Sequence, residues 1–279
     1  MPSMPHPAAA AALALVLVAV GTWCNRRWFG WLPDDLPRAG RKQHARPMPL
    51  AGILVVPAAL PWLLDARSWW LLAGFVLAAA VGFVDDWQKE REREYDWRGK
   101  ALGLGLAAAL AAIEIAPPLD APWLWLAAAL FVFVLSNATN FLDNTDGVAP
   151  ALAAVSLLML GAGGGPAGAI GFAALGFLPW NWPQPRAFLG DAGAYALGLA
   201  TGVFAASAAR HDPIWLLAVA VQLADFGQVV VARLWLGLPP WVGDRRHLTH
   251  IAQNLGLPRR ATAPTFAAIA LLLALGARL

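Results

Sequence analysis

The chain has 279 residues, of which 59% are hydrophobic and 13% are charged, and its mean hydropathy is +0.57. An ordinary soluble domain carries about 25% charged residues, so this composition excludes a soluble globular enzyme and indicates an integral membrane protein. The lone Cys24 excludes an internal disulfide, and the formal net charge of +3 comes without a nucleic-acid motif, so we expect no nucleic-acid partner.

Apolar segments recur along the whole chain, each close to the ~20 residues that cross a hydrocarbon core as a helix. The first, AAAAALALVLVAVGTWC, lacks a basic start, so we interpret it as a retained helix and not as a cleaved signal peptide. Open sheets cannot satisfy their backbone in lipid, which predicts an all-α fold with one membrane-embedded domain over residues 1–279. The predicted spans are residues 8–24, 49–65, 69–86, 101–116, 122–139, 147–163, 166–181, 194–209, 214–236 and 262–278.

Most Lys and Arg residues lie in the odd-numbered connections between these segments. By the positive-inside rule, these connections face the cytoplasm and both termini lie outside.

Four polar groups lie at the ends of the predicted spans, all on the predicted cytoplasmic side. They are Asp85 with Asp86, Asn137 with Asn140, Asp143 and Asp146, then Asp191, and finally Arg245 with Arg246, His247 and His250. Acids near a membrane are costly and usually functional. Carboxylates suit a hard cation such as Mg²⁺, which proteins hold with one or two carboxylates plus substrate phosphates. These parts fit phosphoryl transfer from a nucleotide to a lipid at the cytoplasmic face.

The stretch NATNFLDNTDGVA, residues 137 to 149, predicts a break in a helix. Asn137, Asn140, Asp143 and Asp146 step by three, and at about 100° per residue the last is turned about 180° from the first. We therefore expect the helix to end near Asn140. The two aspartates would then lie on a loop or a new helix start that bends around a ligand.

His247 and His250, at i and i+3, could form a metal pair, but HLTH lacks the HExxH pattern and no third soft ligand is nearby. We prefer contact with phosphate beside Arg245 and Arg246. A solvated basic loop is the alternative.

The order DD, NxxNFxDxxDG, FxGDxG and a basic HxxH loop resembles the polyprenyl-phosphate N-acetylhexosamine-1-phosphate transferases, glycosyltransferase family 4. This family includes phospho-MurNAc-pentapeptide translocase and the enzymes that initiate O-antigen and teichoic-acid linkage synthesis. RKQHARPMPLAG, residues 41–52, also resembles its first cytoplasmic motif. The loop HLTHIAQNLGL looks more like the branch that starts O-antigen, a component of lipopolysaccharide, and related cell-envelope glycans.

The resemblance implies a ten-helix protein of the bacterial cytoplasmic membrane that transfers a sugar-1-phosphate from a UDP-N-acetylhexosamine to undecaprenyl phosphate and releases UMP. Mg²⁺ is the implied cofactor, with Mn²⁺ as its substitute, and a homodimer is one possible assembly. Asp85, Asp86 and Asp191 would be catalytic, with Asp86 and Asp191 as metal ligands. The implied substrate-binding residues are Asn137, Asn140, Asp143, Asp146, Arg245, Arg246, His247 and His250.

Three positions depart from the family's pattern: Ala194 stands where Ser is usual, Asn144 where Gly is common, and Thr249 at the central histidine of the HxHH form. These departures keep open a catalytically impaired relative that binds nucleotide-sugar or lipid. An ion-coupled membrane transporter is a further alternative, because acids within membranes often mark ion routes. Against it, the acids gather at one face and no inverted repeat is visible.

Overall fold

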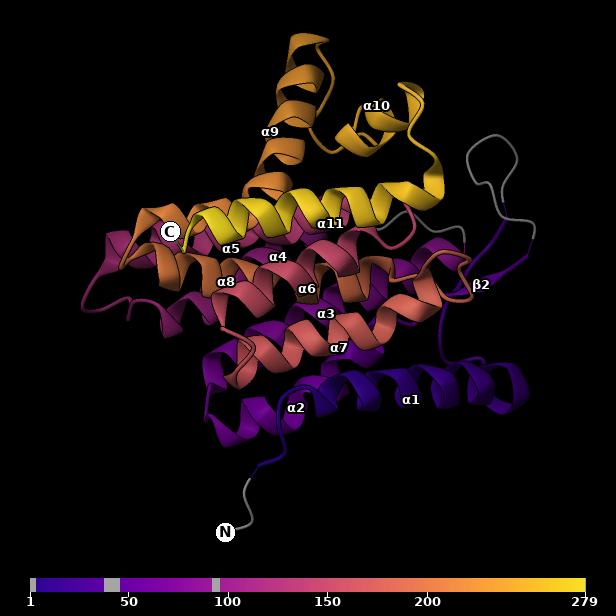
Figure 1. The fold of residues 1–279 in the computed structure, drawn as a ribbon, viewed down its shortest axis with the longest axis horizontal. Coiled ribbons are helices and arrows are strands. Elements are labelled where there is room, and N and C mark those ends of the chain that lie inside the picture. Colours follow the sequence, from indigo (N-terminus) through magenta and orange to yellow (C-terminus); the bar gives the residue numbers. More distant parts are fainter. Residues whose placement is uncertain (1–3, 38–45, 92–95, 279) are drawn as a thin grey trace.

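The computed structural model describes residues 4–37, 46–91 and 96–278, and it is dominated by helices packed into a bundle (Figure 1). Short 3₁₀ and π-helical segments carry the label η. The elements are α1 (Ala9–Cys24), η1 (Asn25–Phe29), β1 (Asp34–Asp35), β2 (Met48–Pro49), η2 (Gly52–Leu54), α2 (Val55–Asp65), α3 (Trp69–Glu90), α4 (Trp97–Ala111), η3 (Ala112–Glu114), α5 (Pro122–Leu142), α6 (Val148–Leu160), α7 (Gly165–Asn181), α8 (Gly190–Ala209), η4 (Pro213–Val219), α9 (Ala220–Trp235), α10 (Leu248–Asn254) and α11 (Arg259–Gly276).

Each of the ten predicted segments contains a helix. Within the described ranges, five helices are long and apolar enough to cross a membrane: Ala9–Trp28, Trp69–Glu90, Pro122–Leu142, Gly190–Ala209 and Pro213–Trp235. Two shorter helices, Gly52–Asp65 and Val148–Leu160, are also apolar. The chain is thus a polytopic membrane protein, while the number of ten crossings and the outside position of both termini stay predictions.

A two-residue antiparallel pair joins β1 to β2, although the sequence predicted no strand. Strands this short give no periodicity from which they could be predicted. The backbone after β2 continues beside the loop before α8, since Phe188 N–H donates to the Pro49 carbonyl and Ala51 N–H donates to the Phe188 carbonyl, both at 2.9 Å. The second half of the RKQHARPMPLAG stretch therefore supports the segment that carries Asp191. Residues 41–45 of that stretch lie outside the described residues.

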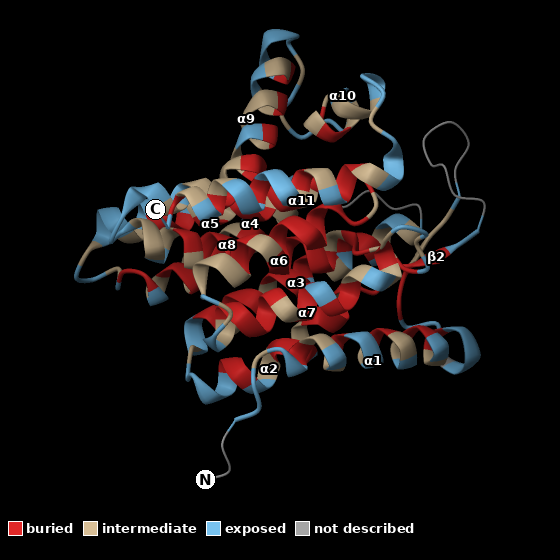
Figure 2. Ribbon diagram, in the orientation of Figure 1, coloured by how far each residue is buried: buried red, intermediate tan, exposed pale blue. Residues whose placement is uncertain are grey.

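Helix α8 lies inside the bundle and packs against α3 and α5 (Figure 2). Most of its residues are buried, and small side chains let the neighbouring backbones approach closely. Gly82 of α3 lies directly against the start of α8, since an added Cβ would lie 2.4 Å from the backbone nitrogen of Ala192. This contact brings the end of α3 against the start of α8, the two places where the sequence puts its aspartates.

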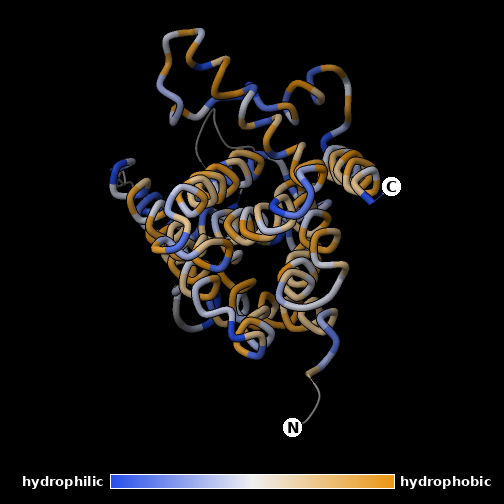
Figure 3. The backbone as a smooth tube through the Cα atoms, turned by 90° about the vertical axis from the view of Figure 1, so that its left-hand side faces the viewer, coloured by the Kyte–Doolittle hydropathy of each residue, from blue (hydrophilic) through white to orange (hydrophobic). Residues whose placement is uncertain are grey.

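The ninth predicted segment is divided into η4 and α9, and α9 leaves the bundle with α10 beside it (Figure 1). Along this part the hydropathy alternates, whereas the bundle helices are mostly hydrophobic (Figure 3). Helix α9 buries Gln222, Asp225 and Arg233, which bond to side chains of other elements. These polar contacts tie α9 to other parts of the chain, although the segment Pro213–Trp235 as a whole is long and apolar enough to cross a membrane. We call residues 220–254 the α9–α10 arm.

Candidate active site

Asp85 and Asp86 lie in the last turns of α3 and are 2% and 3% exposed. Neighbouring helical residues are about 100° apart, so the two carboxylates point in different directions. Asp85 Oδ2 accepts from Lys100 Nζ at 2.6 Å and pairs with Lys89 Nζ at 2.7 Å. Asp86 faces α8, where its two oxygens accept the backbone N–H groups of Asp191 and Ala192, both at 3.1 Å.

The contact between Asp86 and α8 requires a glycine at the first position of that helix. Gly190 has φ +68°, and an added Cβ would lie 2.7 Å from Asp86 Oδ2. A side chain there would be strained and would push the carboxylate away. The glycine of FLGDAGA therefore lets Asp86 bind the first N–H groups of α8 and so fix Asp191.

Asp191 connects the three helices that meet at this end of the bundle. Its Oδ2 accepts from Lys89 Nζ at 2.9 Å and lies 3.5 Å from Lys100 Nζ. Its Oδ1 accepts from Asn140 Nδ2, which extends from the last turn of α5, at 2.9 Å. The structure thus brings together Asp85, Asp86, Asp191 and Asn140 as the sequence predicted, with two lysines among them. We call Asp85, Asp86 and Asp191 the carboxylate cluster.

The cluster provides a position for a cation between two carboxylates. Asp85 Oδ2 and Asp191 Oδ2 both lie within 3 Å of Lys89 Nζ, at 2.7 and 2.9 Å. All the oxygens here suit a hard cation, and two carboxylates plus substrate phosphates are a usual Mg²⁺ environment. Among the described side chains, no group of three or more His, Cys, Asp or Glu is arranged to hold a metal ion. The residues therefore fit Mg²⁺ as a two-carboxylate site, and the assignment of Asp86 as a ligand stays a prediction.

The predicted break after α5 is confirmed. Helix α5 ends at Leu142, Asp143 follows it, and α6 begins at Val148 after Gly147 with φ +77°. Burial raises the pKa of Asp143, and the nearby carboxylates of Asp191 and Asp86 raise it further. Asp143 thus lies close to the carboxylate cluster, on a loop and not on a helix face.

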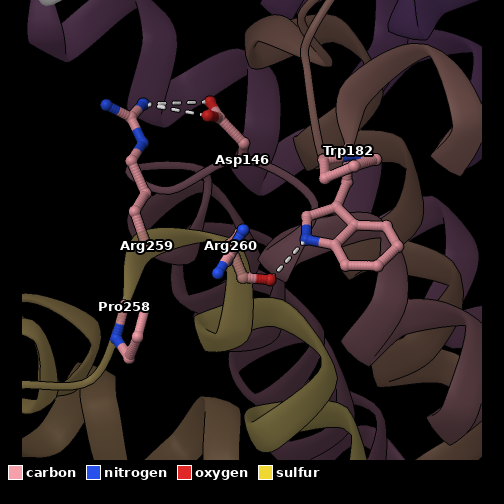
Figure 4. Close-up of a pocket in the computed structure, with 6 residues that line it drawn as sticks. Asp146, Trp182, Pro258, Arg259 and Arg260 are labelled. Carbon is pink, nitrogen blue, oxygen red and sulfur yellow. Dashed lines mark hydrogen bonds and ion pairs between the residues drawn. The ribbon is translucent and has the colours of Figure 1, made fainter.

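Asp146 lies beside a pocket of about 480 Å³ (Figure 4). Its carboxylate pairs with Arg259 Nη2 at 3.0 Å, and Trp182 Nε1 donates to the Arg260 carbonyl at 2.9 Å on the other side of the pocket. Two prolines, Pro183 and Pro258, complete the lining. The pocket combines an aromatic ring with charged groups of both signs, which suits part of a nucleotide or a sugar.

Asn137 does not join the other predicted residues. Asn137 lies one turn before Asn140 on α5, and its Nδ2 donates to the Phe133 carbonyl of the same helix at 2.8 Å. Its role in substrate binding stays a prediction without a contact that supports it.

The two histidines lie at the start of α10, on the α9–α10 arm. His247 is 5% exposed, its Nδ1 lies 2.8 Å from Asp225 Oδ2, and its ring meets the edge of Phe141 at 5.6 Å. Burial lowers the pKa of His250, and the nearby charges of His247 and Arg245 lower it further. The rings of the two histidines are 6.0 Å apart. Among the described residues, no third His, Cys, Asp or Glu joins the two histidines in a group that could hold a metal ion, so the geometry gives no support to a zinc site.

The two arginines before α10 lie in different environments. Arg245 is exposed, whereas Arg246 Nη1 pairs with Asp244 Oδ2 at 2.8 Å. Burial acts to raise the pKa of Asp244, but hydrogen bonds from Arg233 and Arg246 hold it well below its usual range. Arg245 is therefore the more accessible of the two predicted phosphate contacts.

Two of the three departures from the family's pattern contact each other. Thr249 Oγ1 donates to Asn144 Oδ1 at 2.7 Å, and this bond joins α10 to the loop between α5 and α6. The third, Ala194, is fully buried in α8. None of the three replaces a carboxylate of the cluster.

Sequence reasoning missed three polar residues of the site: Lys89, Lys100 and Asp225. Lys89 follows Asp85 by four residues, a spacing at which opposite charges meet on one helix face. Asp225 is an acid inside a predicted span, which is itself a signal of function. Lys100 comes from α4, and nothing in its local sequence indicates that it reaches Asp85.

Comparisons with known proteins give one family model and several relatives. A family model described as "Glycosyl transferase family 4" matches residues 68–209, which include the whole carboxylate cluster. A phospho-N-acetylmuramoyl-pentapeptide-transferase of Synechococcus sp. (strain RCC307) is 33% identical over 144 residues, 44% of this chain and 39% of the relative.

Two further relatives carry other names. A decaprenyl-phosphate N-acetylglucosaminephosphotransferase of Mycolicibacterium smegmatis is 32% identical over 171 residues, 48% of this chain and 41% of the relative. An undecaprenyl-phosphate alpha-N-acetylglucosaminyl 1-phosphate transferase of Thermotoga maritima is 29% identical over 119 residues, 41% of this chain and 38% of the relative. The chain thus spans less than half of the length of these relatives, and their names do not resolve the branch.

Proposed function

Because the chain belongs to glycosyl transferase family 4, we propose that it transfers an N-acetylhexosamine-1-phosphate from a UDP-sugar to undecaprenyl phosphate, with release of UMP. The observation that carries this proposal is the convergence of Asp85, Asp86 and Asp191 with two lysines at the ends of three bundle helices. The similar proteins named as N-acetylglucosamine phosphotransferases support the choice of sugar class. We assign the chain to the O-antigen-type branch on the loop HLTHIAQNLGL.

The position of the cluster suits a reaction between a soluble donor and a lipid acceptor. The cluster lies at the end of two helices long and apolar enough to cross a membrane, α3 and α5, and at the beginning of a third, α8. A phosphate at the membrane surface and a nucleotide in water can both reach such a place. The basic loops on this side support our proposal that it faces the cytoplasm from the bacterial cytoplasmic membrane.

Each polar group then has a distinct task. Asp85 lies between two ammonium groups, and we propose that it acts on the lipid phosphate. Asp86 fixes Asp191 through the first N–H groups of α8. Lys89 and Lys100 attract and orient the phosphates of donor and acceptor, because a cation next to a transferring phosphoryl group stabilises its charge.

Mg²⁺ bound by Asp191 and a second carboxylate of the cluster would neutralise negative charge on the donor's diphosphate. Asn140 donates to the other oxygen of Asp191 and so holds that carboxylate in one orientation. We place part of the donor in the pocket beside Asp146 and Trp182.

The reaction is tested by incubating purified protein with undecaprenyl phosphate, Mg²⁺ and a panel of UDP-N-acetylhexosamines, and measuring UMP release with and without the lipid. We expect lipid-dependent UMP from one donor, which also identifies the sugar. UDP-sugar binding by folded protein with no UMP from any donor contradicts the proposal and favours an impaired relative.

A further inference from the structure

Asp225 is a fully buried acid on α9, and both of its oxygens have assigned partners. Oδ2 lies 2.8 Å from His247 Nδ1, and Oδ1 accepts the backbone N–H of Leu248 at 2.6 Å. These contacts cross from α9 to the first residues of α10, 22 and 23 positions later in the chain. One carboxylate therefore holds both the ring of His247 and the start of the helix that follows it.

The contact determines which nitrogen of His247 carries the proton. A carboxylate only accepts hydrogen bonds, so Nδ1 must donate to Oδ2. In the neutral ring the remaining nitrogen, Nε2, then holds a lone pair. Nε2 can therefore accept a proton from one substrate group and pass it to another.

The ring is linked to the carboxylate cluster through two neighbouring residues of α5. It packs edge-on against Phe141, the neighbour in sequence of Asn140, which itself donates to Asp191. Among the described residues, the ionisable groups near the ring include His250 on α10, Arg245 and Arg246 in the preceding loop, and Arg233 on α9, which lies over Phe141.

We propose that Asp225 is a positioning residue for the transfer reaction. It holds His247 with its proton on Nδ1, so that Nε2 takes the proton of the acceptor phosphate as that phosphate attacks and returns it to the UMP that leaves. The role in catalysis rests on the proposed function. The effect on the histidine does not.

Anchoring of α10 alone does not account for a buried acid. Thr249 already bonds to Asn144 at 2.7 Å, and Gln253 Nε2 donates to Thr145 and Thr262 at 3.3 and 3.2 Å. These neutral bonds join the helix to two other elements. Burying a carboxylate is costly unless it is paired, so its presence here is explained better by what it does to the ring.

The substitution Asp225→Asn gives a sharp test, because the asparagine side chain has a single oxygen. That oxygen cannot accept hydrogen bonds from both Leu248 N–H and His247 Nδ1. The N–H of Leu248 can only donate, so the amide oxygen stays with it and the amide NH₂ faces Nδ1 of His247. Nδ1 must then accept, and the proton of the neutral ring moves to Nε2. The variant keeps the size of the side chain but reverses the tautomer.

The tautomer is measured by NMR on protein labelled with ¹⁵N-histidine in lipid bilayers, at a pH well above the ordinary imidazole pKa of about 6.5. The chain has five histidines, and the spectrum of His247→Gln assigns the signal. Thr249→Val is the matched control, since it loses a bond of α10 without touching the ring of His247. We expect the proton on Nδ1 in the unmodified protein and in Thr249→Val, and on Nε2 in Asp225→Asn.

The same tautomer in the unmodified protein and in Asp225→Asn overturns the proposal. A proton on Nε2 in the unmodified protein also overturns it, and this result needs no folded variant. In the UMP assay we expect kcat of Asp225→Asn to fall about 100-fold, a usual loss for a proton-transfer group, with a smaller change in the KM of the donor. A reversed tautomer with unchanged kcat overturns the role in the reaction. If the unmodified protein releases no UMP with any donor, the proposed function fails, while the NMR comparison still decides whether Asp225 positions His247.

Discussion

The carboxylate cluster and the α9–α10 arm hold their polar groups by different means. In the cluster, long helices meet at glycines, and the charged groups are fixed by the first backbone N–H groups of α8 and by two lysines. In the arm, Asp225 joins α9 to the start of α10, a helix of seven residues, and Thr249 joins α10 to the loop between α5 and α6, both through side-chain hydrogen bonds. The cluster therefore depends on backbone packing, whereas the arm depends on individual hydrogen bonds.

Removal of divalent metal is the change with the largest expected effect. The ammonium groups of Lys89 and Lys100 already occupy the cation position of the cluster. The test asks whether these lysines support turnover without a metal ion. We expect EDTA to lower lipid-dependent UMP release at least about 100-fold, because a bound metal supplies several kcal/mol of charge stabilisation. Added Mg²⁺ should restore it. Turnover that persists in EDTA would show that the lysines replace the metal.

The backbone packing of the cluster is tested at Gly82. The Cβ of Gly82→Ala would lie 2.4 Å from Ala192 N, so α3 and α8 must separate. We expect the free energy of unfolding to fall by about 1–3 kcal/mol, the usual effect of overpacking, measured by denaturation of the purified protein.

Gly105→Ala on α4 is the control, since nothing lies within 4 Å of its added Cβ. We expect its free energy of unfolding to stay the same or to rise by up to about 1 kcal/mol, because alanine is the better helix former and meets no atom there. Equal losses in the two variants would show that α3 and α8 do not meet at Gly82.

In the arm, Thr249→Val removes the hydroxyl that donates to Asn144 while keeping the shape of the side chain. The loss of one such bond is about 1 kcal/mol. We expect faster amide hydrogen exchange in α10, with exchange in α8 unchanged. Exchange that rises equally in both helices would contradict the view that the arm is held independently of the cluster.

The smallest effect concerns pH. The folded protein holds the pKa of His250 below its ordinary value of 6.5. In the pH window between this lowered pKa and 6.5, the unfolded chain therefore binds more protons than the folded chain. Stability contributed by the neutral ring is therefore present above 6.5 and is lost as the pH falls through this window. We expect the thermal midpoint of His250→Gln to depend less on pH between about 5 and 7 than that of the unmodified protein. His211→Gln, at an exposed site between α8 and η4, is the control and should keep the original dependence.

The sequence predicts much of the cluster and less of the arm. Apolar segment lengths predict the helices, and aspartates at segment ends predict which residues meet, as Asp85, Asp86, Asn140 and Asp191 do. It does not show that Lys100 of α4 reaches Asp85, because that contact depends on how two helices pack. Nor does it show that Thr249 and Asn144 form a pair, since residues 105 positions apart carry no local signal of contact. The bend between η4 and α9 follows from buried polar side chains whose partners lie on other elements.

The most direct test of the central claim, that the carboxylate cluster is the reaction centre, is lipid-dependent UMP release by Asp85→Asn, Asp86→Asn and Asp191→Asn. Asp120→Asn is the matched control, because it removes the same charge from an exposed position between η3 and α5. We expect the three cluster variants to lose at least about 100-fold in kcat, as expected when charge stabilisation is removed from a phosphoryl-transfer site, while Asp120→Asn retains turnover. Full turnover in all three cluster variants would contradict the account.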